Sequence, residues 1–267
     1  SKDFEVELQE ISTNWQSEFS LENGPIYSIG YIYGYIDGSS RIFFALHHLS
    51  VDSMSWRILA EDLMEIYNGK DLGFKGSSYR QWVNTVREYA NTHEGERDYW
   101  VNILADYESN NNQLTKLIVS EDTQNFANVV LNKEQTKQLL TESNRAYNTQ
   151  VNDILLTALG YALFEVTGSR VNHIVLEGHG REEIDSRIDI TRTLGWFTTI
   201  YPVRLEIREG LDHSLKMIKD TLRRIPNKGI GYGSLIGYQV KALPRISFNY
   251  LGQFDKEDKL ENSLTSS

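Results

Sequence analysis

The periodicity of hydrophobic positions changes several times along the chain. Apolar residues spaced at i, i+3 and i+4 predict amphipathic helices, whereas alternation and short apolar runs predict strands. The first half predicts a helix over 6–22, strands over 25–37 and 41–46, and helices over 53–69, 79–92 and 95–106. The second half predicts strands over 127–131, 173–177, 200–207 and 245–251, and helices beginning near 133 and over 151–166 and 211–225. Helices and strands mix throughout, which indicates an α/β or α+β sandwich.

Two local signals refine the first half. The segment 41–46 (RIFFAL) is an almost continuous apolar run, which is typical of a strand buried on both faces. Asp52 or Ser53 stands directly before the next apolar-periodic segment, so either can cap the helix that begins there. A strand followed at once by a capped helix gives a tight turn at residues 47–52.

The chain also predicts two lobes. Residues 107–125 are polar and rich in asparagine, which favours a boundary there. We therefore expect an N-terminal lobe over 1–110, a linker over 111–125 and a C-terminal lobe over 126–267. A length of 267 residues is sufficient for two lobes with cores of their own.

Composition excludes several classes of protein. The net charge is −10, from 27 lysine and arginine against 37 aspartate and glutamate residues, which argues against a non-specific nucleic-acid binder. The absence of cysteine excludes disulfides, thiol nucleophiles and thiolate metal sites. No apolar run approaches the ~20 residues of a membrane-spanning helix, and the polar start does not look like a signal peptide. We expect a soluble, cytoplasmic protein that binds neither membrane nor nucleic acid.

The densest polar cluster in an apolar setting begins with His47 and His48 at the end of the 41–46 strand. One interpretation is a structural histidine pair. Another is acid–base chemistry, since a histidine pKa near ~6.5 suits proton transfer at neutral pH. A metal site would need ligands from elsewhere, because adjacent strand residues point to opposite faces. A Ser-His-Asp hydrolase fits poorly, because no Gly-x-Ser-x-Gly elbow is present.

A second cluster begins at Glu177, which ends an apolar strand and precedes two glycines within EGHGRE. It is either a solvated loop carboxylate or a carboxylate held at a cleft, where desolvation would raise its pKa. Three further segments, 192–202, 226–233 and 248–254, contain aromatic residues interrupted by glycine. The stretch 226–233 contains GxGYG but follows a helix, so it does not match a dinucleotide fingerprint.

In order along the chain, these segments resemble the motifs of epimerization domains of nonribosomal peptide synthetases. The HHxxxD motif alone is shared by the whole condensation-domain superfamily, including condensation and cyclisation domains. The later motifs narrow the resemblance to epimerization domains. The motifs are His47-His48 with Asp52, EGHGRE at 177–182, RTLGWF at 192–197, the glycine-rich stretch at 226–233 and NYLG at 249–252. Family members are longer than this chain, so we expect it to be incomplete at both ends.

The resemblance implies two lobes similar to chloramphenicol acetyltransferase, arranged as a V-shaped pseudo-dimer. It implies an isomerase of secondary metabolism that converts the α-carbon of an aminoacyl or peptidyl thioester from L to D. The substrate would be held on the phosphopantetheine arm of an upstream peptidyl carrier domain, among neighbouring synthetase modules. No metal and no directly bound cofactor would be needed.

The resemblance also implies roles for individual residues. His48 and Glu177 would be the two acid–base groups. His47 would be structural, and Asp52 would orient the HHxxxD motif through an arginine, for which Arg192 is a candidate. The supporting or substrate-binding set would further contain Trp196, Asn249 and Tyr250.

The alternative is a condensation domain, which joins two carrier-bound thioesters through a peptide bond. That reaction would use His48 but has no required role for Glu177.

Overall fold

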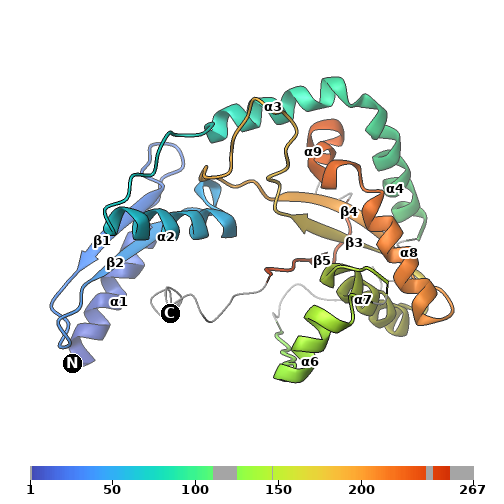
Figure 1. Ribbon diagram of the computed structural model, residues 1–267, viewed down its shortest axis with the longest axis horizontal. Helices are drawn as coiled ribbons and strands as arrows, with labels where there is room; N and C mark the ends of the chain where they lie inside the picture. Colours follow the sequence, from blue (N-terminus) through green and yellow to red (C-terminus); the bar gives the residue numbers. More distant parts are fainter. Residues whose placement is uncertain (1, 111–124, 146, 239–242, 253–267) are drawn as a thin grey trace. The chain divides into compact units, whose positions relative to one another are not determined.

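The structure is a computed structural model that describes residues 2–110, 125–145, 147–238 and 243–252 (Figure 1). Contacts between Cα atoms divide the chain into two compact units. The described part of the first unit consists of residues 2–82 and 185–197, and that of the second of residues 83–110, 125–145, 147–184, 198–238 and 243–252. Helix α3 (Tyr79–Thr92) runs from one unit into the other.

The first unit begins with helix α1 (Lys2–Ser17) and an antiparallel hairpin of β1 (Tyr27–Ile32) and β2 (Arg41–Leu46). Helix α1 packs on the hairpin through Trp15. A Cβ at Gly30 would lie 2.0 Å from the Trp15 ring, so only glycine lets this ring approach the strand. After β2 follow the short helix η1 (His48–Ser50) and helix α2 (Ser53–Tyr67).

The prediction that 41–46 is buried on both faces is wrong. Within β2 only Ala45 is buried, and Ile42 is 55% exposed. The described residues place one neighbouring strand beside β2, in a two-stranded sheet on which α1 packs. An apolar run therefore predicted the strand correctly but not its burial.

The second unit contains a three-stranded sheet in the order β4-β3-β5. Strand β3 pairs with β4 in antiparallel and with β5 in parallel orientation. The strands are β3 (Val171–Gly178), β4 (Thr199–Glu206) and β5 (Ser247–Phe248). The helices are the last part of α3, then η2 (Glu94–Glu96), α4 (Arg97–Asn110), α6 (Lys133–Lys137) with a π-helical turn η3 (Gln138–Glu142), α7 (Val151–Thr167), α8 (Leu211–Arg223), η4 (Pro226–Gly229) and α9 (Ile230–Ile236).

The core of this unit forms where α4, α7, α8 and α9 pack on the strands. Trp100 of α4 is fully buried and contacts the rings of Tyr201 and Tyr232. This packing assigns residues 83–110 to the second unit, whereas the predicted boundary places them in the N-terminal lobe. The predicted linker lies outside the described residues except for Asn125.

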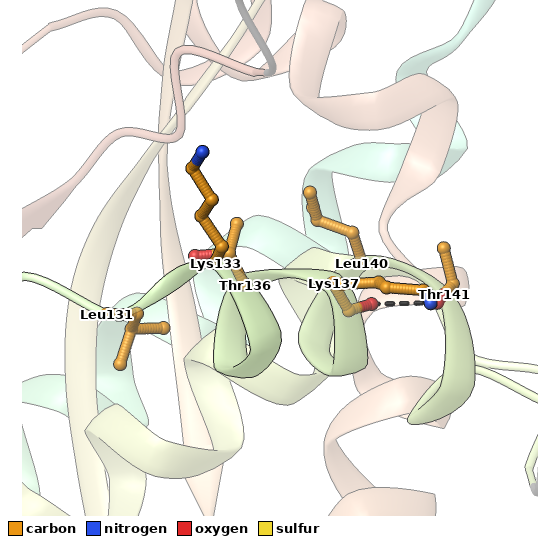
Figure 2. A pocket seen from close by; sticks show the side chains of 6 residues that line it. All are labelled: Leu131, Lys133, Thr136, Lys137, Leu140 and Thr141. Carbon is orange, nitrogen blue, oxygen red and sulfur yellow. Dashed lines mark hydrogen bonds between the residues drawn. The ribbon is translucent and has the colours of Figure 1, made fainter.

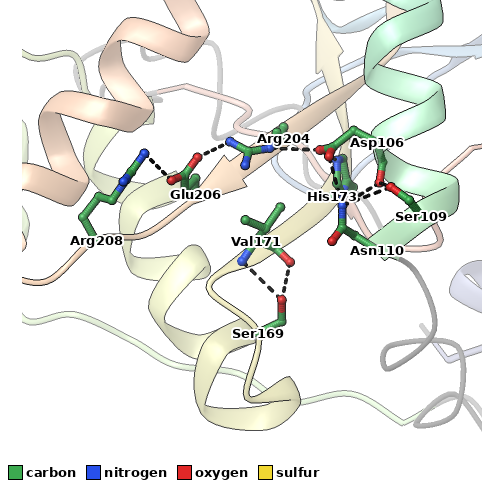
Figure 3. A network of polar contacts seen from close by, with 9 residues as sticks. All are labelled: Asp106, Ser109, Asn110, Ser169, Val171, His173, Arg204, Glu206 and Arg208. Atoms are coloured by element: carbon green, nitrogen blue, oxygen red, sulfur yellow. Dashed lines mark hydrogen bonds and ion pairs between the residues drawn. The ribbon is translucent and has the colours of Figure 1, made fainter.

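A chain of polar contacts also joins α4 to the sheet (Figure 3). The Oδ2 atom of Asp106 lies 2.8 Å from His173 Nε2 and accepts from Arg204 Nε at 2.9 Å. His173 and Arg204 are register partners on β3 and β4, and Arg204 pairs in turn with Glu206. Burial of the imidazole lowers the pKa of His173, although the nearby Asp106 opposes this shift. Burial therefore favours the neutral form of this histidine inside the fold.

Most predicted elements are confirmed, and the segments 41–46 and 79–92 have the predicted bounds. The strand predicted over 127–131 is wrong: these residues pair with no strand of the described chain, and Val129 and Val130 are about nine-tenths exposed. The last strand is much shorter than predicted, and α9 was not predicted. No described helix has the length and apolar character required to cross a bilayer.

Candidate active site

His47 and His48 stand where β2 ends. The His47 N–H donates to Ile26 O at 2.9 Å, and its Nδ1 accepts from the Leu49 N–H at 3.1 Å. His47 therefore caps η1 through its side chain. His48 begins this helix and is exposed, with its ring centroid 4.7 Å from that of Trp196.

Asp52 is the cap of α2, which confirms one of the two predicted caps. Its Oδ1 accepts from the N–H of Ser55 at 2.7 Å, and its Oδ2 accepts from the N–H of Phe197 at 3.2 Å. The carboxylate is buried. It therefore satisfies a free N–H of the first helical turn and at the same time holds the 192–197 segment beside the HHxxxD turn.

The predicted link from Asp52 to Arg192 is wrong. Arg192 pairs with Asp62 in the middle of α2, and Glu61 and Glu65 lie within 4 Å of its guanidinium group. These three carboxylates lie on one helix surface and together attract the arginine. The 192–197 segment is therefore held at α2 by two separate contacts, through Arg192 to the middle of the helix and through Asp52 at its N-terminal cap.

Two residues that the sequence did not single out complete this part of the site. Ser55 is fully buried, and its Oγ lies 2.7 Å from Asp52 Oδ1. The hydroxyl of Tyr79 donates to the carbonyl of Trp196 at 2.6 Å. The spacing D-x-x-S before an apolar run is a weak form of a capping signal, so it could have indicated Ser55. Nothing in the sequence pattern indicates the contact of Tyr79.

Glu177 lies at the end of β3 in the second unit, partly buried. Its Oε2 accepts from the side-chain amide of Asn249 at 2.8 Å. Because β5 runs parallel beside β3, the residues that follow it reach the same end of the sheet. The structure thus joins two predicted site residues, Glu177 and Asn249, and Tyr250 directly follows the latter.

The loop after Glu177 is held by a second set of ionic contacts. Glu182 lies 3.1 Å from His179 Nε2 and 2.9 Å from Lys228 Nζ. Lys228 has left-handed backbone angles, with φ of 50°, which is costly for a residue with a side chain.

Gly229 brings the same turn close to β4. A Cβ at Gly229 would lie 1.9 Å from the Tyr201 ring, and the φ of this residue is +83°, so both space and backbone require glycine. Burial raises the pKa of Tyr201 to about 12, so its hydroxyl stays protonated at neutral pH. Gly229 therefore serves the close packing of this turn against β4.

A pocket lies along α6 and η3 and contains none of the predicted site residues (Figure 2). Its lining combines two lysines with threonine and leucine side chains. These residues are Leu131, Lys133, Thr136, Lys137, Leu140 and Thr141.

Comparison with known families identifies the chain. The sequence profile of the family described as Condensation domain matches residues 2–266. The chain belongs to this condensation-domain family. Among curated relatives, it is 44% identical over 257 residues to N-(5-amino-5-carboxypentanoyl)-L-cysteinyl-D-valine synthase of Amycolatopsis lactamdurans, and 39% identical over 277 residues to gramicidin S synthase 1 of Brevibacillus brevis. These alignments cover 95% and 94% of this chain but 7% and 25% of the relatives, so the chain spans a quarter or less of their length.

Solved structures support the same assignment for this condensation-domain chain. The epimerization domain from the third module of tyrocidine synthetase B is 34% identical, with a TM-score of 0.71 over 93% of this chain and 61% of that one. The first condensation domain of the CDA synthetase is 17% identical, with a TM-score of 0.53 over 88% and 51%, and shows the fold alone. The predicted family and the α/β fold class are thereby confirmed.

Proposed function

We propose that this condensation-domain chain is an epimerization domain. It inverts the α-carbon of an aminoacyl or peptidyl thioester, from L to D, on the phosphopantetheine arm of a carrier domain. The 34% identity to an epimerization domain over 93% of this chain supports this, because the condensation domain compared above is only half as similar in sequence. The relatives that are named synthases support a place among neighbouring synthetase modules.

The chemistry of inversion sets the requirement. A thioester carbonyl acidifies the neighbouring α-proton, and inversion removes that proton on one face and returns one on the other. Two groups that exchange protons are therefore needed, together with polar groups that stabilise the enolate. We assign the proton transfers to His48 and Glu177, and supporting contacts to Tyr250, Asn249 and Trp196. The reaction as written needs no metal or bound cofactor of the domain, and phosphopantetheine enters with the substrate.

The observation that carries the proposal is the pairing of Glu177 with Asn249. The amide donor fixes one carboxylate oxygen at the end of β3, and the side chain is only partly buried. An oriented carboxylate of this kind can accept and return a proton. Condensation joins an amine to a thioester and gives such a group no required task.

The test is chiral analysis of the carrier-bound product. The intact module, with its carrier loaded with an L-aminoacyl or an L-peptidyl thioester, is incubated and the residue is released and resolved. A mixture of L and D epimers without a new peptide bond is expected from at least one of the two substrates. A new peptide bond with unchanged configuration would assign the chain to condensation and overturn the proposal.

A further inference from the structure

Ser55 holds both backbone groups of Gly195. Its hydroxyl accepts from the Gly195 N–H at 3.1 Å, and the Gly195 carbonyl and Asp52 Oδ1, at 3.0 and 2.7 Å, are both in reach of its proton. All of these contacts are buried, where hydrogen bonds are strong and their loss is costly. One serine of α2 thus fixes the position of a residue 140 positions later in the chain.

The next two residues are held as well. The Phe197 N–H donates to Asp52, and the Trp196 carbonyl accepts from the Tyr79 hydroxyl at 2.6 Å. A Cβ at Gly195 would lie 2.3 Å from the Tyr79 ring, so this residue has no room for a side chain. The backbone of 195–197 is therefore tied to α2 and to α3, while the Trp196 ring remains 37% exposed.

This exposed ring contacts His48. The centroids are 4.7 Å apart with the planes at 54°, and among the described residues no hydrogen bond reaches either ring nitrogen of His48. The orientation of the imidazole therefore depends on ring packing. For a proton-transfer group this matters, because a displacement of 1 Å can reduce a rate about 100-fold.

We infer that Ser55 is a positioning residue: by holding Gly195, it keeps the Trp196 ring against His48 and so fixes the direction of the imidazole. This role in the reaction rests on the proposed function. The contact itself does not, since it is a property of the first unit alone. A purely structural role for Ser55, as part of the α2 cap, would affect stability without changing the surroundings of His48.

The experiment reads the His48 ring directly by NMR, in protein labelled with ¹³C-histidine. The His48 signals are assigned by their absence in a His48→Ala variant. An indole ring close by shifts the imidazole protons, and a Trp196→Leu variant gives their positions without it. In Ser55→Ala the signals are expected to move towards the Trp196→Leu positions. Ser53→Ala, the same change at an exposed site two residues earlier, is the matched control and should leave them in place.

Two further variants keep the test decisive if Ser55→Ala is less stable. Ser55→Thr retains the hydroxyl and is expected to keep the parent signals. Tyr79→Phe removes the second tether and is expected to shift the His48 signals in the same direction as Ser55→Ala. Folded molecules give their own signals, so partial unfolding does not hide the result. Parent-like His48 signals in both Ser55→Ala and Tyr79→Phe would overturn the inference.

The kinetic readout separates the two proposals. In the intact module, Ser55→Ala is expected to slow α-proton exchange about 10- to 100-fold with little change in KM. If the parent shows no exchange, the proposed function fails while the NMR comparison still decides the role of Ser55. If the parent exchanges and Ser55→Ala matches it in rate, the positioning role is overturned.

Discussion

At the scale of single residues, the two histidines of the pair differ in their contacts. The Nδ1 atom and the backbone N–H of His47 both form hydrogen bonds at the turn that leaves β2. His48 is exposed and contacts an aromatic ring. The sequence left structural and chemical interpretations of the pair open. The contacts give His47 a structural task and leave His48 available for chemistry.

We predict that His48→Ala lowers the epimerization rate at least about 100-fold, the size of a general acid–base contribution. Stability should change little, because the side chain is exposed. Chiral analysis of the loaded carrier measures the rate, and thermal melting measures the fold. His213→Ala, at an exposed histidine of α8, is the control and should retain parent activity. An active His48→Ala protein would remove His48 from the mechanism.

At the scale of elements, the sequence predicted best where local pattern and capping agree. The bounds of α3 follow from its amphipathic spacing, and Asp52 was found as a cap because its oxygen has to satisfy the first turn of α2. The strand predicted at 127–131 failed, since an apolar run does not show whether a neighbouring strand exists to pair with it. Helix α9 was not predicted because it contains two glycines, which have a low helix propensity.

Asp52→Ala is predicted to damage folding more than chemistry. Loss of the cap costs about 0.5–2 kcal/mol, and the Phe197 N–H left without this buried acceptor adds about 1–3 kcal/mol. Urea denaturation measures the loss in the free energy of unfolding. Asp52→Asn retains an acceptor oxygen and should lose less. A variant that unfolds like the parent but is inactive would place Asp52 in the reaction itself.

The contact between α4 and the sheet predicts a pH dependence of stability. Burial lowers the pKa of His173 in the folded state below its ordinary value of 6.5, against the effect of Asp106 and with a smaller contribution from Arg204. The unfolded chain therefore takes up a proton as the pH falls through 6.5, while the folded protein takes up this proton only at a lower pH. Stability that is complete above pH 6.5 is lost progressively below it.

His173→Gln is the variant that tests this prediction. Glutamine can still donate to Asp106 but does not titrate. Between about pH 7.5 and 5.5, the free energy of unfolding should fall more steeply for the parent than for His173→Gln. The measurement is urea denaturation at a series of pH values. Parallel curves would show that His173 does not take part in this dependence.

At the scale of the whole molecule, sequence order and spatial grouping differ. Residues 185–197 lie between two segments of the second unit yet belong to the first, because Ser55 and Asp52 bind them to α2. Motifs 140 residues apart could be assigned to one site only by resemblance to a family, since no local pattern encodes such a contact. Local sequence pattern does not predict the pairing of Glu177 with Asn249 either, because it depends on a parallel strand pair formed by segments 72 positions apart.

The two proposed acid–base groups belong to different units, so inversion is a test of the whole chain. Glu177→Gln keeps the shape of the side chain and removes its ability to exchange protons. We predict that it blocks inversion but spares α-proton exchange with solvent from one epimer, because His48 can remove and return a proton on its own face. Each epimer, loaded on the carrier, is incubated in D₂O, and both deuterium uptake and chirality are followed.

Glu183→Gln, an exposed neighbour in the same loop, is the control and should invert like the parent. Exchange with retention from a single epimer would identify the face that His48 serves. Unchanged inversion in Glu177→Gln would exclude Glu177, and Tyr250 or a water molecule would then have to supply the second proton.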